Sequence, residues 1–281
     1  MGVILMLLAS ASFATMSLFI KTLGPEIPLA QLVFLRCWLA LPILLIILLI
    51  KERPLLVKAR GGLLLRTLFG MSAMHCFFYA LTHMPLANCI FIGRAQPLII
   101  AMFAPLVVGE KTPKAAWLAI VAGLIGVAMI LQPGMAWQTA AWVALAGAAL
   151  SAGAHLLVRR LNRTDYPLVI VFNFTLLTGL LTSFTALPVF IPLSSTQWLL
   201  ISGVALFSTL GQLLMTTAYR KDNAPAVAAA SYSSVILSVI FGYLFWHEIP
   251  QPTAWLGGGL IIAGGLLLVR SRFRINAPPA A

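Results

Sequence analysis

Ten stretches of mainly apolar residues follow one another along this 281-residue chain, and they limit its fold more than any other feature. Each is close to the length of about 20 residues that an α-helix needs to cross a bilayer. The chain is 61% hydrophobic and only 9% charged, whereas soluble proteins carry about 25% charged residues. We therefore predict an all-α integral membrane protein with ten transmembrane helices, at residues 2–20, 29–50, 63–82, 85–108, 115–131, 138–157, 167–190, 197–218, 224–246 and 254–269.

The loop lysines and arginines predict the orientation of these helices. If the N-terminus is cytoplasmic, fourteen loop or tail basic residues fall on the cytoplasmic side and Lys21 alone falls outside. Such an asymmetry is the usual signal that orients membrane proteins. The net charge of +12 is therefore explained by topology, because the basic residues form no single stripe that would bind nucleic acid. We expect both termini in the cytoplasm.

The second half of the chain resembles the first when the two are aligned at a spacing of 138 residues. Five pairs of identical residues match: Ala80 and Ala218, Phe103 and Phe241, Glu110 and Glu248, Trp117 and Trp255, and Gly126 and Gly264. This spacing predicts one repeat at 1–136, a second at 137–270, and a disordered basic tail at 271–281. With five helices in each repeat, the second copy is inverted, as in many secondary transporters. Channels and receptors can also contain repeats.

The two repeated segments also resemble a known protein family. Residues 78–131 begin FYALTHMPLA and contain a mid-helix Pro97, a Gly109-Glu110 pair and a Gly-rich last helix, and the second copy follows the same order. Both are similar to the EamA repeats of the drug/metabolite transporter superfamily, and the match covers essentially the whole chain. The resemblance implies ten helices around a central cavity, with the fifth helix of each repeat outside. Members carry amino acids, riboflavin, S-adenosylmethionine, nucleobases and drugs.

Two residues depart from the pattern of that family. Phe13 stands where the first helix of such repeats often has a tryptophan, and Val235 stands opposite Pro97 in the second copy. The two halves are therefore expected to bend differently.

Arg94 is the most informative candidate for substrate binding. It lies near the middle of a predicted span, where a charge costs about 3 kcal/mol on insertion scales. Pro97 has no N–H, so the Gly93 carbonyl loses its helical bond, and a bend with free backbone groups suits a cavity wall. We predict that Arg94 binds a carboxylate and that Gly93 and Pro97 form a hinge. Alternatively, Arg94 is structural and bonds helix carbonyls or Gln96.

Arg36 and His75 are expected at a similar depth to Arg94. Arg36 lies seven residues into the second span, His75 seven before the end of the third, and Arg94 nine into the fourth. At about 1.5 Å per residue the three could converge. The alternatives are an arginine that reaches the outer interface and a hydrogen-bonded core histidine. Arg66, near the inner edge of the third span, is interpreted as reaching the membrane surface.

Further candidates come from polar and aromatic residues within the spans. Tyr232 is the repeat counterpart of Arg94, so pseudo-symmetry predicts that both line the cavity. The other polar candidates are Gln96, His155, Asn173 and Gln212, and the aromatic candidates for wall or stacking contacts are Phe13, Trp38 and Tyr79. Aromatic residues in spans more often pack or face lipid.

The positions of the acidic residues argue against a carrier of cations. All six fall in loops or at span edges, whereas cation-exporting carriers commonly use a buried carboxylate. Drug-cation antiport is therefore disfavoured, while coupling through His75 or His155 stays open because imidazole titrates near neutrality. The three cysteines have no metal-site spacing. We expect no metal and no cofactor.

Glycine concentrates in the last span of each half. Small residues allow close helix packing in lipid, so we interpret these positions as packing surfaces, with a homodimer face as one possibility.

Together these features predict a plasma-membrane transporter of a small metabolite, an amino acid or related carboxylate, that works by alternating access and acts as an exporter rather than an enzyme. The alternatives are a riboflavin-like, nucleobase-like or S-adenosylmethionine-like substrate, or a channel.

Overall fold

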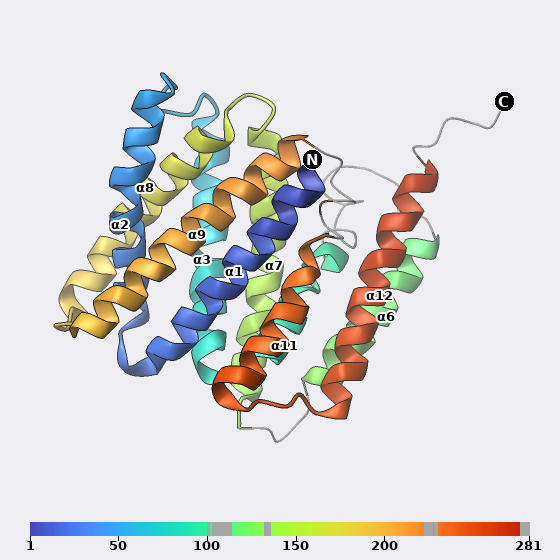
Figure 1. The fold of residues 1–281 in the computed structure, drawn as a ribbon. Helices are drawn as coiled ribbons and strands as arrows, with labels where there is room; N and C mark the ends of the chain where they lie inside the picture. The colour runs from blue at the N-terminus through green and yellow to red at the C-terminus, as the bar shows by residue number, and fades with distance from the viewer. Residues whose placement is uncertain (100–101, 103–113, 132–135, 222–226, 228–229, 276–281) are drawn as a thin grey trace.

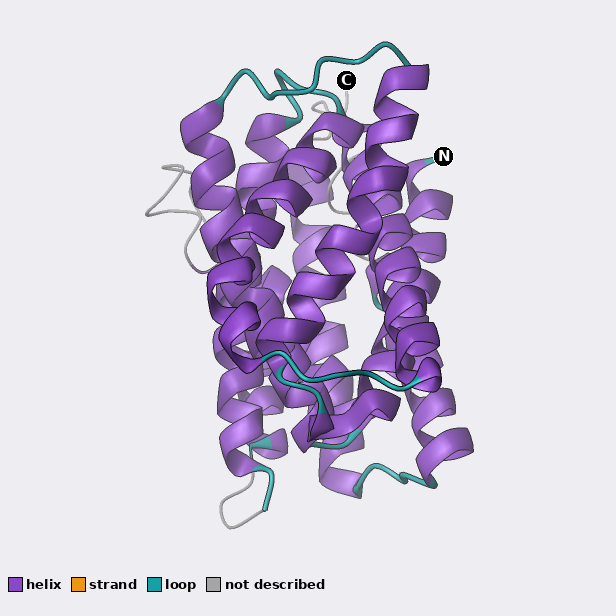
Figure 2. Ribbon diagram, turned by 90° about the vertical axis from the view of Figure 1, so that its left-hand side faces the viewer, coloured by secondary structure: helices purple, strands orange, loops and turns teal. Residues whose placement is uncertain are grey.

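The computed structural model describes residues 1–99, 102, 114–131, 136–221, 227 and 230–275, and these residues form helices joined by short connections (Figures 1 and 2). The first half contains α1 (Gly2–Leu23), α2 (Leu29–Ile50), α3 (Arg60–His83), α4 (Leu86–Gly93) and α6 (Lys114–Ile130). The second contains α7 (Gln138–Leu161), α8 (Pro167–Ala186), α9 (Ser195–Lys221), α11 (Ser233–Trp246) and α12 (Pro252–Ile275). Two short 3₁₀ turns, Gly24–Glu26 and Leu187–Val189, follow α1 and α8.

Within the described residues, six helices are long and apolar enough to cross a membrane. They are α1, α2, α3, α7, α8 and α9, and shorter apolar helices lie at Ile120–Ile130, Ser233–Trp246 and Pro252–Leu267. The all-helical membrane fold is thus confirmed, while the number of ten spans stays a prediction. Many large apolar side chains are exposed on the bundle, among them Ile46, Phe184 and Leu199.

The helices end where backbone chemistry requires it. Gly24 has φ of +64° and ends α1, in a conformation that a residue with a Cβ rarely adopts. Pro167 and Pro252 begin α8 and α12, where a missing N–H costs no helical bond. α12 continues to Ile275, five residues into the predicted tail, and its last ten residues, from Leu266 to Ile275, contain no proline or glycine.

Helix contacts between the two halves are reciprocal. α1 packs on α9 while α3 packs on α7, and the pairs α2 with α8, α4 with α11, and α6 with α12 join matching helices. This is the pattern expected of two copies related by a pseudo-two-fold axis. Figure 1 shows α6 and α12 side by side at one edge of the bundle, as expected for the fifth helix of each half.

The Gly-rich helices α6 and α12 pack against each other within one chain. A Cβ placed on Gly126 would lie 2.4 Å from the Gly257 carbonyl oxygen, and one on Gly257 would lie 2.5 Å from the Gly126 carbonyl oxygen. The absence of side chains at these two positions therefore lets the backbones touch. At this contact the small residues serve intramolecular packing.

The bundle has two ends. The N-terminal face carries the start of α1 and the loops 51–59 and 162–166; the opposite end, called the Lys21 face, carries the connections 24–28 and 247–251 (Figure 1).

Candidate functional site

In each half, a turn interrupts helical residues in the part of the chain that the structure describes. α4 ends at Gly93, Arg94 and Ala95 form a turn, and helix resumes at Gln96. The turn is tightened by a bond from the Ala95 N–H to the Ile92 carbonyl. In the second half, α11 begins after a turn at Tyr232, the residue 138 positions beyond Arg94. Helix breaks at membrane depth are tolerated where they are buried in protein or line a cavity.

A central cavity of about 280 Å³ lies beside the first break. Its wall reaches towards the N-terminal face, where it includes Met6 in the second turn of α1, Arg159 near the end of α7 and Tyr219 near the end of α9. In the other direction it ends near Ser17 and Phe78, before the Lys21 face. The cavity is therefore closed at the Lys21 face and extends towards the N-terminal face.

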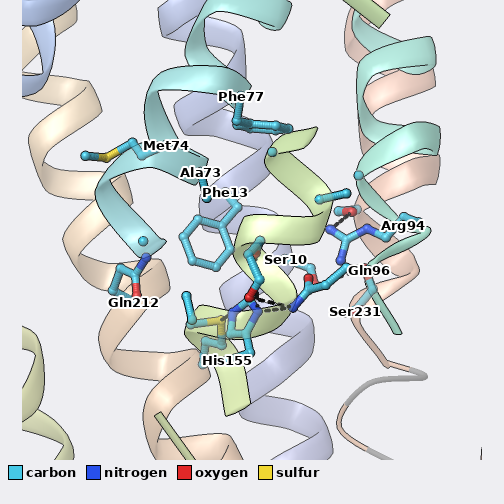
Figure 3. A pocket seen from close by; sticks show the side chains of 18 of the residues that line it. Ser10, Phe13, Ala73, Met74, Phe77, Arg94, Gln96, His155, Gln212 and Ser231 are labelled. Atoms are coloured by element: carbon cyan, nitrogen blue, oxygen red, sulfur yellow. Dashed lines mark hydrogen bonds between the residues drawn. The ribbon is translucent and has the colours of Figure 1, made fainter. Parts of the chain in front are cut away.

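Six of the eleven predicted binding residues lie along this cavity, and so do both predicted hinge residues. They are Phe13, Arg36, Arg94, Gln96, His155 and Gln212, with Gly93 and Pro97. Figure 3 shows Phe13 in the centre, Gln212 on one side, and Arg94 and Gln96 on the other. The structure therefore brings residues from α1, α2, α7, α9 and the interrupted helix around one space.

Arg94 joins the two halves of the protein. Its Nη2 donates a hydrogen bond to Oγ of Ser234, in the first turn of α11. Ser234 is almost fully buried and also lines the cavity. Because a hydroxyl is neutral, the guanidinium keeps its charge uncompensated by this contact. Arg94 can therefore bind a substrate anion at the seam between the halves.

Gln96 and His155 form a polar cluster on the same side. The Gln96 side-chain nitrogen contacts Nδ1 of His155 and lies 3.4 Å from the Ser151 carbonyl oxygen. The other ring nitrogen of His155 lies 3.1 Å from Sδ of Met215 on α9. Both ring nitrogens therefore have partners inside the protein, which fixes the ring between α7 and α9.

Two candidates on α3 lie outside the cavity. His75 Nδ1 lies 2.9 Å from the Met71 carbonyl oxygen, one turn earlier on the same helix. Tyr79 stacks on His83 with 4.1 Å between ring centroids and an angle of 17°. Neither residue lines the cavity. Of Arg36, His75 and Arg94, which were expected at a similar depth, only the two arginines line the cavity.

Three more candidates also lie away from the cavity. Trp38 is 41% exposed and packs on Phe34 at the bundle surface. Asn173 donates hydrogen bonds from Nδ2 to the Leu55 carbonyl at 2.7 Å and the Val169 carbonyl at 2.9 Å, which ties the loop before α3 to α8. Tyr232 is buried against Gly265 of α12. Their contacts here are with neighbouring helices and loops.

Arg66 is a cavity residue that the sequence did not predict, and so are Arg159, Tyr219 and Ser234. Arg66 was expected to reach the membrane surface, but it is only 4% exposed and lines the cavity. Its guanidinium lies 3.9 Å over the Phe174 ring, a cation–π contact. The signal that could have found it is helical phase: Arg66, Gly70, Ala73, Met74 and Phe77 recur at spacings of three and four and all line the cavity.

The Lys21 face is closed by a polar network. Lys21 Nζ lies 2.7 Å from Oε1 of Glu248 and donates a hydrogen bond of 2.9 Å to the Met84 carbonyl. Oε2 of Glu248 accepts a 2.8 Å hydrogen bond from the Leu86 N–H at the start of α4. Glu248 therefore caps α4, a helix of the other half. Glu110, its repeat counterpart, lies outside the described residues.

Comparison with known proteins agrees with this architecture. The chain is 30% identical to a pseudopaline exporter of Pseudomonas aeruginosa over 96% of both chains, and 28% identical to an uncharacterized transporter of Helicobacter pylori over 95% of this chain and 94% of that protein. It is also 28% identical to a riboflavin transporter of Vibrio cholerae, over 72% of this chain and 69% of that protein.

A solved crystal structure superposes with a TM-score of 0.66, at 18% identity over 98% of this chain and 96% of that one, which supports the fold. The profile of the EamA-like transporter family matches residues 1–132 and again residues 138–270, so the resemblance seen in the sequence is confirmed. The chain is an integral membrane protein and belongs to the EamA-like transporter family.

Proposed function

We propose that this transporter carries an amino acid or a related carboxylate by alternating access between the two sides of the membrane. The observation that carries the proposal is Arg94: a guanidinium beside a helix break, lining a central cavity and bonded across the two halves to neutral Ser234. Among the described residues that line this cavity there is no aspartate or glutamate. A cationic cavity favours an anionic group on the substrate.

The same observation argues against a cationic substrate such as S-adenosylmethionine. A second candidate is a flavin-like compound, and the observation in its favour is Phe13, whose ring lies inside the cavity in Figure 3. A relative named as a riboflavin transporter supports it as well. An aromatic ring system could stack on Phe13, whereas a small amino acid would use the arginine.

We further propose an exporter in a plasma membrane, with both termini cytoplasmic. The distribution of fourteen loop or tail basic residues against Lys21 supports this orientation, and a relative named as an exporter supports the direction. In that orientation the cavity extends towards the cytoplasm. The conformation is then inward-facing, ready to receive a substrate for export.

The test is counterflow in proteoliposomes. A graded panel of anionic, zwitterionic and cationic amino acids, riboflavin and S-adenosylmethionine is offered to the wild type and to Arg94→Gln. Exchange of carboxylate-bearing compounds that the substitution abolishes supports the proposal. Exchange of riboflavin that survives the substitution favours the flavin candidate. Single-channel currents without counterflow would identify a channel instead.

A further inference from the structure

Besides Arg94 and the exposed Arg159, two buried arginines line the cavity. Arg36 on α2 and Arg66 on α3 both line the cavity, and each is only 4% exposed. Nε of Arg36, and Nε and Nη1 of Arg66, are buried and have no hydrogen-bond partner in the part of the chain that the structure describes. Buried N–H groups of a charged side chain are normally paired, because an unpaired one loses its bonds to water.

The groups that do contact these arginines are weak partners. Arg36 Nη2 lies 3.8 Å from the Cys37 sulfur, and Arg66 Nη2 lies 3.5 Å from Oε1 of Gln212. The remaining contact of Arg66 is the Phe174 ring. None of these groups is anionic. Two buried positive charges thus line one cavity, and no described residue that contacts them supplies a counter-charge.

Arg66 lies on the Gln212 side of the cavity, and Arg94 lies on the other side. Gln212, which accepts from Arg66, is on one side of the Phe13 ring in Figure 3, and Arg94 is on the other. The cavity therefore has a cationic group at each of two sides and an aromatic ring between them. A ligand with a single carboxylate can satisfy only one of the two sides.

We propose that Arg36 and Arg66 form a second anion subsite, and that the substrate is an amino-acid derivative with at least two carboxylates. One carboxylate binds Arg94, another is held by the Arg36–Arg66 pair, and the intervening carbon chain lies along Phe13. Arginine suits this task because its planar guanidinium binds a carboxylate through two parallel hydrogen bonds. The inference rests on the proposed function and extends it from one carboxylate to two.

The experiment compares probes that differ in the number of carboxylates: L-alanine with one, L-glutamate with two and N-carboxymethyl-L-glutamate with three. Binding is measured in detergent by isothermal titration calorimetry and by thermal shift, and exchange is measured by counterflow. The proteins are the wild type, Arg66→Gln, Arg66→Lys and the control Arg60→Gln, which removes an exposed arginine from the same helix.

We expect the wild type to bind L-glutamate at least tenfold more tightly than L-alanine. Arg66→Gln removes that difference, Arg66→Lys keeps part of it, and Arg60→Gln keeps all of it. Without ligand, Arg66→Gln has the same or a higher melting temperature than the wild type, because it removes an unpaired buried charge. A purely structural arginine would lower the melting temperature when removed.

Two results would overturn the inference, and they are distinguishable. If the wild type exchanges L-alanine and L-glutamate equally well and Arg66→Gln changes neither, the second subsite is absent while the carboxylate carrier stands. If no carboxylate probe binds or exchanges, the proposed function fails and the second subsite fails with it.

Discussion

Lys21 at the end of α1 and Glu248 after α11 form an ion pair with 2.7 Å between Nζ and Oε1, and the pair joins the two halves of the protein. Both side chains are largely shielded from solvent, with 11% and 22% exposed. The Glu248 carboxylate also accepts a hydrogen bond from the Leu86 N–H. The beginning of α4, the end of α1 and the connection to α12 are therefore fastened together on the face where the cavity is closed.

Replacing the carboxylate should loosen this closure. Glu248→Gln removes the counter-charge of Lys21, so we expect the cavity to become accessible from the Lys21 face. The measurement is the rate at which an impermeant thiol reagent labels Ser17→Cys, in a background without Cys37, Cys76 and Cys89. A several-fold increase is expected. Glu26→Gln, an exposed carboxylate on the same face, should leave the rate unchanged; equal rates in both variants contradict the closure.

Arg94→Gln should abolish carboxylate transport, whereas Ser234→Ala should reduce it far less. The arginine supplies the charge, while the neutral serine hydroxyl orients it through a hydrogen bond. A hydrogen bond with a charged group contributes about 1.5–3 kcal/mol, so we expect about a tenfold to hundredfold loss of affinity for Ser234→Ala. Counterflow with labelled L-glutamate measures both. Equal losses would mean that the contact between the halves, and not the charge, is what matters.

If the helix break acts as a hinge, a substitution of Pro97 should change the rate of substrate exchange more than the affinity for substrate. Pro97→Ala restores an N–H that can bond the Gly93 carbonyl, which favours a continuous helix. We expect slower exchange with little change in binding, because a stiffer hinge raises the barrier between conformations rather than altering the contacts of Arg94. Initial exchange rates and calorimetric affinities from the same preparation check this. A loss of binding equal to the loss of rate would assign Pro97 to the site and not to the hinge.

The contact between α6 and α12 has no room for side chains. Gly257→Val places a branched side chain against the Gly126 carbonyl, Met129 and Ile130, and overpacking of this kind costs about 1–3 kcal/mol. A lower melting temperature in detergent is expected. Gly259→Val, on the same helix but with nothing within 4 Å of its added Cβ, is the matched control. If Gly257→Val melts like the wild type, the two helices are not held by this contact.

The sequence predicted helix positions well, since a membrane span is defined by a long apolar run that needs no knowledge of neighbours. It predicted the depth of His75 but not the direction of its side chain. His75 is nine residues after Arg66, so at about 100° per residue the two point to opposite sides of α3. Only the packing of α3 on α7 and α8 decides which of these sides faces the cavity.

The missed Arg66 has a related cause. A basic residue near a span edge usually reaches towards water, and six residues of helix separate Arg66 from the start of α3 at Arg60. The stack on Phe174 turns the side chain inward. Helical phase groups Arg66 with Gly70 and Met74 on one face of α3, but it does not show that this face meets Phe174, which comes from the other half of the protein.

The cavity arginines that lack an anionic partner affect how the empty transporter returns to its starting conformation after it has released a substrate. A carrier that reorients while empty has to move guanidinium charge through the membrane field with no counter-ion, whereas a loaded carrier moves the charge already neutralised. One-for-one exchange should therefore be faster than net release, and net release should depend on voltage. The arginines that select the substrate would then also couple the export of one substrate molecule to the uptake of another anionic molecule.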